Sequence, residues 1–129
     1  TIHSGSLYVA TRYTKPENFN RGDIILFNHF DSTYVKRVIG LPGDTVSFED
    51  GNVYINGKRY EEDYLPAGTI TDSTEGEYTV PEDCFFVLGD NRLYSYDSRL
   101  WEDPFVHYDD VEARGVWFVN IPWWSGRTE

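Results

Sequence analysis

Residues 33–55 read TYVKRVIGLPGDTVSFEDGNVYI, and this stretch decides the fold. Short runs of Val, Ile, Tyr and Phe alternate in it with Gly, Pro and Asp, which is the pattern of strands joined by turns. Asp50 and Gly51 separate two such runs, and glycine accepts the positive φ of a tight hairpin turn at little cost. We therefore predict three strands in this stretch, at 33–39, 44–49 and 52–55.

The same pattern continues on both sides of this stretch. No sustained apolar period of about 3.6 residues is present, so long helices are not expected. Residues 61–83 are rich in Glu, Asp, Thr, Gly and Pro, which favours a surface excursion. We expect one mainly β domain over residues 1–129. Its remaining predicted elements are strands at 23–28, 84–88 and 111–120 and a short helix or turn near 98–101.

Composition excludes several classes of protein. The chain carries a formal net charge of -11 at pH 7, so a nucleic-acid partner is excluded because phosphates would be repelled. No apolar run approaches the roughly 20 residues that a membrane-spanning helix needs. The single Cys84 lies in an apolar run and is interpreted as a buried thiol, with no internal disulfide. The three His residues lack metal-ligand spacing, so no metal site is expected.

Lys36 interrupts an apolar strand and is the first candidate for chemistry. Successive side chains of a strand point to opposite faces, so Lys36 and Val38 share one face. A lysine on an apolar face loses hydration, which lowers its pKa and favours a neutral amine that can accept a proton from a hydroxyl. The alternative is that only the stem lies on the surface while the ammonium reaches water. The pattern alone leaves both interpretations open.

Residues 89–99 read GDNRLYSYDSR and bring several charges into a short segment. Asp97 lies two residues before Arg99, so a strand or tight turn can bring the two side chains together. Arg37 is a second cation that is expected to join Asp97. Such a charge cluster more often fixes geometry than reacts.

Three segments together resemble the type I signal peptidases, a family of membrane-anchored Ser-Lys proteases. They are RGDIILF at 21–27, YVKRVIGLPGD at 34–44 and GDNRLYSYDSR at 89–99, in the family's order. The resemblance covers roughly residues 1–120. It implies a catalytic core of coiled antiparallel β-sheets, with the short excursion of the compact Gram-positive type and no cofactor.

The resemblance also implies roles for individual residues. Lys36 matches the general base of the dyad, and Ser95 matches the serine that orients the lysine amine. A supporting group of charged side chains matches Arg37, Asp97 and Arg99. Positions that line the pockets for small substrate side chains match Ile2, Tyr34 and Val35.

The N-terminus departs from the family pattern. The family's nucleophilic serine lies in a Ser-Met-x-Pro-Thr-Leu box, and Thr1-Ile2 resembles the Thr-Leu that closes it. The nucleophile and the membrane anchor are then expected before Thr1, and the chain as given is expected to be inactive. Ser6 is the alternative nucleophile, although no Pro-Thr-Leu follows it.

The implied function is endopeptidase removal of signal peptides from exported preproteins, after small residues, at the outer face of the cell membrane. Trp123 and Trp124 are candidates for contact with the membrane lipid surface, because Trp favours that interface. The alternative function is that of a non-catalytic accessory protein, for instance one that acts with pilins in pilus assembly. Such relatives tend to lose the dyad, whereas this sequence keeps Lys36 and Ser95.

Overall fold

The computed structural model of the chain describes residues 6–11, 16–71, 76–93 and 95–120. These residues form strands and two three-residue 3-10 helices, and the strands pair antiparallel into two sheets. The mainly β class expected from the sequence is therefore confirmed. In chain order the elements are β1 (Ser6–Thr11), η1 (Pro16–Asn18), β2 (Ile24–His29), β3 (Ser32–Gly40), β4 (Thr45–Glu49), β5 (Asn52–Ile55), β6 (Lys58–Arg59), β7 (Glu77–Thr79), β8 (Cys84–Leu88), β9 (Val106–His107), η2 (Tyr108–Asp110) and β10 (Val111–Asn120).

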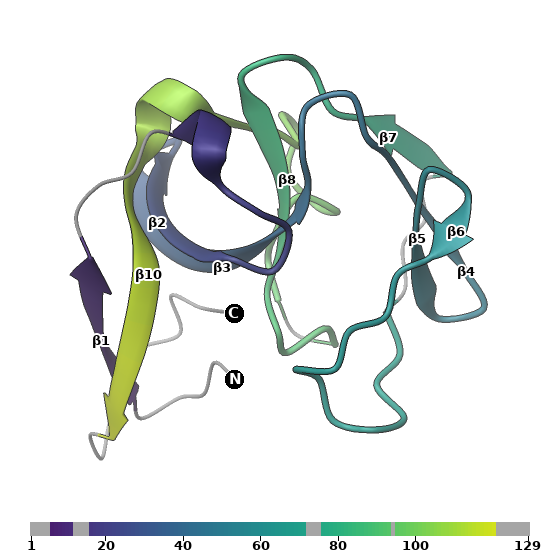
Figure 1. The fold of residues 1–129 in the computed structure, drawn as a ribbon, viewed down its shortest axis with the longest axis horizontal. Helices are drawn as coiled ribbons and strands as arrows, with labels where there is room; N and C mark the ends of the chain where they lie inside the picture. Colours follow the sequence, from purple (N-terminus) through teal and green to yellow (C-terminus); the bar gives the residue numbers. More distant parts are fainter. Residues whose placement is uncertain (1–5, 12–15, 72–75, 94, 121–129) are drawn as a thin grey trace.

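The larger sheet has six strands in the order β1-β10-β2-β3-β8-β9, and the smaller has four in the order β6-β5-β4-β7. Figure 1 shows the curled strands β2, β3 and β10 on one side, the smaller sheet on the other, and β8 between them. All six strands predicted from the sequence are present, with ends shifted by at most one residue. The short strands β6, β7 and β9, together with β1, were not predicted.

The predicted hairpin at Asp50 and Gly51 is confirmed. Strands β4 and β5 pair directly across it, and both turn residues have positive φ, 53° at Asp50 and 80° at Gly51. A Cβ on Gly51 would also lie 2.9 Å from Ile70 Cγ2. The backbone conformation and the close approach of Ile70 therefore both require glycine at this position.

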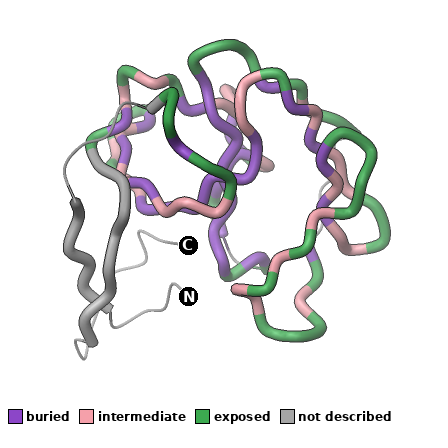
Figure 2. Tube along the Cα trace, viewed as in Figure 1, coloured by how far each residue is buried: buried purple, intermediate pink, exposed green. Residues whose placement is uncertain are grey.

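Strand β8 is buried on both faces, which explains its uninterrupted apolar sequence. Phe85 and Val87 belong to one core cluster, which also contains the residues Phe19, Ile25, Phe27, Val38, Trp101, Val106 and Val111. Cys84, Phe86 and Leu88 point the other way into a second cluster, with Ile39, Val46, Val53, Ile55 and Val80. Figure 2 shows this burial along β8 and along the last six residues of β3. Cys84 is a buried free thiol, as expected.

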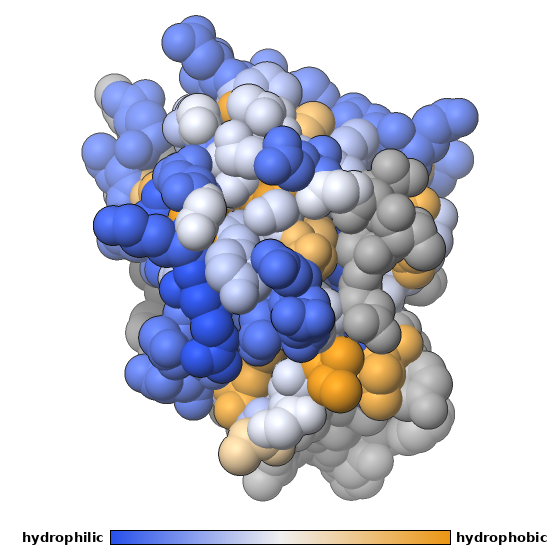
Figure 3. All heavy atoms as spheres, turned by 90° about the vertical axis from the view of Figure 1, so that its right-hand side faces the viewer, coloured by the Kyte–Doolittle hydropathy of each residue, from blue (hydrophilic) through white to orange (hydrophobic). Residues whose placement is uncertain are grey.

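The polar segment 61–83 does not lie wholly on the surface. Its residues 77–79 form β7 and pair with β4, so this part of the segment belongs to the smaller sheet. Thr71 is buried, while residues 61–70 are all exposed or half-buried. The face of the molecule on this side is mostly hydrophilic, with small hydrophobic areas (Figure 3). In the part of the chain that the structure describes, no helix is long and apolar enough to cross a membrane.

Candidate active site

Lys36 lies in the middle of β3, and its side chain is completely buried, with 0% relative exposure. Neighbouring β2 pairs with β3 in a register that sets Ile25 opposite Lys36. The ammonium therefore does not reach water, and the structure decides between the two interpretations that the sequence pattern left open. A buried lysine in this position needs a polar partner close to its amine.

That partner comes from a distant part of the chain. A hydrogen bond of 3.1 Å joins Lys36 Nζ, as donor, to the Ser95 hydroxyl, although the two residues lie 59 positions apart. Ser95 is itself buried, in the loop that follows β8. The ring of Tyr34, two residues before Lys36 on the same face of β3, has its centre 5.7 Å from Lys36 Nζ. Strand β3 and the loop after β8 thus bring the predicted pair together.

The loop that carries Ser95 is fixed by Asp97, which has no exposed surface. Its Oδ2 accepts a hydrogen bond of 3.0 Å from the Gly89 N–H, where the loop leaves β8. Arg99 binds both carboxylate oxygens, with Nε 2.9 Å from Oδ1 and Nη2 3.0 Å from Oδ2. Such charge-assisted, two-point contacts are among the strongest hydrogen bonds in proteins. Asp97 and Arg99 therefore close the loop around Ser95.

Arg37 does not join Asp97, and the expectation of one shared cluster is wrong in this respect. Its guanidinium binds both carboxylate oxygens of Asp90, at 2.9 and 2.7 Å, and also donates to the Gly22 carbonyl at 2.8 Å. The reason is the alternation of side chains along β3, which directs Arg37 to the face opposite Lys36. Two separate buried ion pairs, Arg37–Asp90 and Asp97–Arg99, hold the loop instead of one.

Three residues of the loop, and one residue outside it, were not identified from the sequence as site residues. Asp90 and Arg92 lie inside the segment 89–99, but their partners could not be read from that segment. Ser98 is fully buried, and its hydroxyl accepts a hydrogen bond of 2.9 Å from the Val87 N–H. Glu62 lies in the polar segment, where no sequence signal distinguished it from its exposed acidic neighbours.

The residues expected to line substrate pockets are only partly described. Tyr34 is half-buried, with its ring 5.9 Å from Phe27 and 5.3 Å from Trp101. Val35 is 2% exposed and lies on the other face of β3. Ser6, the alternative nucleophile, begins β1 opposite Asn120. The further predicted positions Ile2, Trp123 and Trp124 lie outside the described residues.

The chemistry that this arrangement permits is proton transfer at a buried amine held by a neutral hydroxyl.

Among the described residues, no group of three or more His, Cys, Asp or Glu side chains gathers as a metal ion would require. A cavity of about 300 Å³ lies elsewhere, between the β4–β5 turn and residues 59–71, and includes neither Lys36 nor Ser95.

Known proteins are similar to this chain in sequence and in fold. The family model described as "Signal peptidase, peptidase S26" matches residues 1–123. The chain is 47% identical over 109 residues to signal peptidase I of Bacillus amyloliquefaciens, which covers 77% of the chain and 58% of that protein. It is also 47% identical over 91 residues to signal peptidase I S of Bacillus subtilis, covering 63% of the chain and 49% of the relative. The chain thus spans about half the length of these curated relatives.

A solved structure agrees with the sequence matches. The crystal structure of a signal peptidase I from Enterococcus faecalis matches with a TM-score of 0.62 and 36% sequence identity. The match covers 74% of this chain and 95% of that one.

Proposed function

Because the chain belongs to the signal peptidase family, peptidase S26, we propose that it carries the general base of an endopeptidase that removes signal peptides from exported preproteins. The single observation that carries this proposal is the hydrogen bond between the buried Lys36 amine and Ser95. The proposed place of action is the outer face of the cell membrane.

In the proposed mechanism Lys36 moves the proton. Burial disfavours a charged ammonium, so the amine is suited to take a proton from a serine hydroxyl as its oxygen bonds to the scissile carbonyl carbon. Lys36 then gives this proton to the leaving amine, and a water molecule later hydrolyses the acyl-enzyme with Lys36 again as base. Ser95 keeps the amine in the orientation that this transfer needs.

The proposed mechanism also requires an attacking serine. We expect it in a Ser-Met-x-Pro segment on the N-terminal side of Thr1, with Ser6 as the alternative within the chain. The resemblance of Thr1-Ile2 to the end of that box favours the first position.

The proposed substrate is an extended signal peptide that adds main-chain hydrogen bonds to strand edges. Alternate side chains of an extended peptide point the same way, so pockets at alternate positions select small residues such as Ala. Tyr34, Val35 and Ile2 are the proposed lining of these pockets. Contact of Trp123 and Trp124 with the lipid surface stays a prediction.

The alternative, a non-catalytic accessory protein that acts with pilins, has less support. A role limited to assembly gives no reason to bury a lysine amine against a serine hydroxyl, since burying a charge-bearing group is costly. The two functions are separated by single-turnover cleavage of a labelled signal peptide, with the chain extended by a Ser-Met-x-Pro segment before Thr1. We expect cleavage after a small residue; an extended, folded chain that leaves the peptide intact contradicts the enzyme proposal.

A further inference from the structure

A buried ion pair joins the polar segment to the loop that carries Ser95. Arg92 has no exposed side-chain surface, and Glu62 is only 10% exposed. The Arg92 guanidinium donates to both Glu62 carboxylate oxygens, at 3.0 and 2.6 Å, and to the Thr71 hydroxyl at 2.9 Å. Burial lowers the pKa of the Arg92 guanidinium, but hydrogen bonding to Glu62 and its negative charge outweigh this and raise it. Arg92 therefore stays charged, and its buried charge is compensated by Glu62.

Arg92 in turn fixes the backbone of the loop. Its Nε donates a hydrogen bond of 2.8 Å to the Gly89 carbonyl, at the end of β8. Its own carbonyl accepts a hydrogen bond of 2.9 Å from Arg99 Nη2. Ser95 lies between Arg92 and Arg99 in the sequence, so the Arg92 guanidinium holds the start of the loop at Gly89 and the Arg99 guanidinium closes the loop across the Ser95 position.

A second set of contacts leads from Glu62 to the strand that carries Lys36. The Tyr64 hydroxyl donates a hydrogen bond of 2.6 Å to Glu62 Oε2. The ring of Tyr64 lies 3.8 Å from the Arg37 guanidinium carbon, a cation–π contact. Arg37 is the residue after Lys36 in β3. One carboxylate thus contacts two side chains, one connected to each half of the Lys36–Ser95 pair.

We propose that Glu62 is a positioning residue for the Lys36–Ser95 pair, acting through Arg92 on the loop and through Tyr64 on β3. As a positioning role for catalysis, this inference rests on the proposed function. A misplacement of a reacting group by about 1 Å can cost roughly 100-fold in rate, so a contact outside the reacting centre can control activity. The segment 61–71 then supports the geometry of the Lys36–Ser95 pair, although it does not touch the reacting groups.

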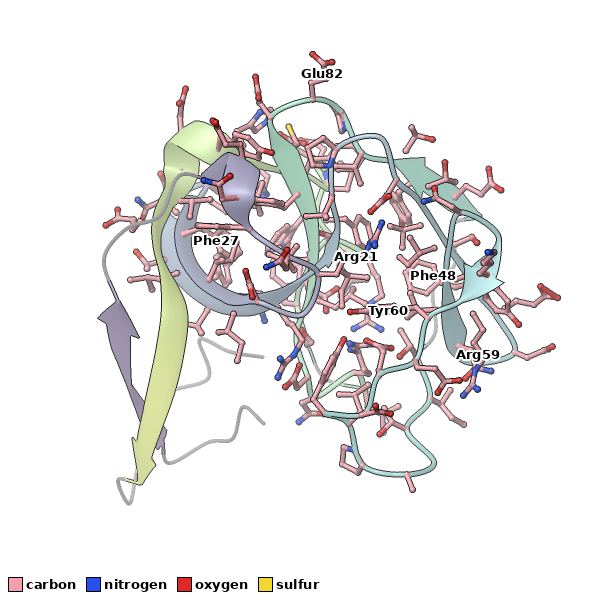
Figure 4. All side chains as sticks on the ribbon, in the orientation of Figure 1. Arg21, Phe27, Phe48, Arg59, Tyr60 and Glu82 are labelled. Atoms are coloured by element: carbon pink, nitrogen blue, oxygen red, sulfur yellow. The ribbon has the colours of Figure 1, made fainter. Side chains whose placement is uncertain are left out.

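The first test needs no catalysis. The titration of the Lys36 side chain is followed by NMR in the 129-residue chain, comparing the parent with Glu62→Gln, which keeps the shape but removes the charge. We expect the Lys36 midpoint to move by more than about 0.3 pH unit. The matched control is Glu61→Gln, because Glu61 is 71% exposed and pairs with Arg59, an exposed residue of β6 that is labelled in Figure 4. It is expected to leave the midpoint in place.

The second test is kinetic and uses the N-terminally extended chain. Glu62→Gln is expected to lower kcat about tenfold or more while KM changes less than about threefold, because the reacting groups and not the peptide pockets are displaced. Arg92→Gln is expected to cause part of this loss, because it breaks the contact to the loop and leaves the contact through Tyr64, and the double variant should lose no more than Glu62→Gln alone. The double variant leaves no unpaired buried charge, and it replaces Glu62→Gln if that variant does not fold.

The outcomes separate the two proposals. An unchanged Lys36 midpoint together with a parent-like kcat in a folded Glu62 variant overturns the positioning role. An equal change in Glu61→Gln also overturns it, because any acidic residue of the segment would then have the same effect. If the extended parent does not cleave at all, the proposed function fails, and the NMR comparison still decides whether Glu62 positions Lys36.

Discussion

Lys36 and Arg37 are neighbours in β3 but point to opposite faces, so that one side chain reaches Ser95 and the other reaches Asp90. Both contacts end in the same loop, between β8 and the Asp97 turn. The strand therefore holds that loop from both of its faces. The first three predictions concern these contacts, and the fourth concerns the turn that follows β3.

Replacing Lys36 by arginine should abolish cleavage in the extended chain. A guanidinium stays protonated at any relevant pH and cannot accept the proton of the nucleophile. We expect a loss of at least about 100-fold, the lower end of what a general base contributes. Single-turnover cleavage of a labelled signal peptide measures it, with the exposed Lys58→Arg as the control. Parent-like cleavage by the Lys36→Arg variant would show that Lys36 is not the base.

Replacing Ser95 by alanine should have a milder effect. It removes one orienting hydrogen bond, worth on the order of 1 kcal/mol, which corresponds to about a fivefold slower reaction. Ser98→Ala provides the contrast, because it leaves the buried Val87 N–H without its acceptor. That variant should lose about 1 to 3 kcal/mol of unfolding free energy in a denaturant titration. A Ser95→Ala variant as inactive as Lys36→Arg would assign Ser95 a larger role than orientation.

The Arg37–Asp90 ion pair should matter more for stability than the exposed pair in the polar segment. The two side chains are 8% and 2% exposed, and removing one partner leaves a buried charge without compensation. We expect Asp90→Asn to lower the free energy of unfolding by about 3 to 5 kcal/mol. Glu61→Gln, which breaks an exposed pair with Arg59, should cost less than about 1 kcal/mol. Equal losses of unfolding free energy in urea would show that burial does not make the Arg37–Asp90 pair more important for stability than the exposed pair.

The stability of the protein should depend on pH through Asp44. Burial alone would raise the pKa of this carboxyl, but hydrogen bonds from Arg21, the Leu41 N–H and Asn56 outweigh it and lower the pKa. Because the folded pKa lies below the unfolded value of about 3.9, the stabilisation is fully present above that value. It is lost as the pH falls through the folded pKa.

Asp44→Asn should therefore be less stable than the parent at neutral pH, and the difference should shrink as the pH falls below about 4. Denaturant unfolding at a series of pH values measures this. Asp50→Asn is the control, because Asp50 is exposed and asparagine tolerates its positive φ. A difference between Asp44→Asn and the parent that stays constant down to about pH 2 contradicts the mechanism.

The sequence correctly predicted the elements that depend on a few neighbouring residues. The hairpin at Asp50 and Gly51 and the apolar run 84–88 were correct, because turn chemistry and continuous apolar residues act over a few neighbours. The three-residue β7 was missed because its pairing with β4 depends on contacts across 34 positions, as between Thr45 and Thr79. Two- and three-residue strands carry too few side chains to show alternation.

The sequence predicted which residues form the candidate site better than it predicted which side chains pair with one another. The pattern of β3 made Lys36 a candidate but left its burial open, and the resemblance implied the pair of Lys36 and Ser95, whose side chains the structure places in contact. The predicted partner of Arg37, Asp97, was wrong. Asp90 and Asp97 are both acidic residues of one segment, and only the three-dimensional path of the loop distinguishes them. Glu62 could not be found, since an acidic residue in a polar segment normally indicates solvent exposure.

The burial of β8 on both faces has a consequence for how the molecule opens. Separating the smaller sheet would expose Phe86 and Leu88, and opening the curled larger sheet, of which β8 is itself a strand, would expose Phe85 and Val87. Neither change can occur without exposing one face of β8, so the two sheets should unfold as one cooperative unit. The backbone amides of residues 84–88 should then exchange with deuterium only when the whole structure opens, and they should be among the slowest in the chain.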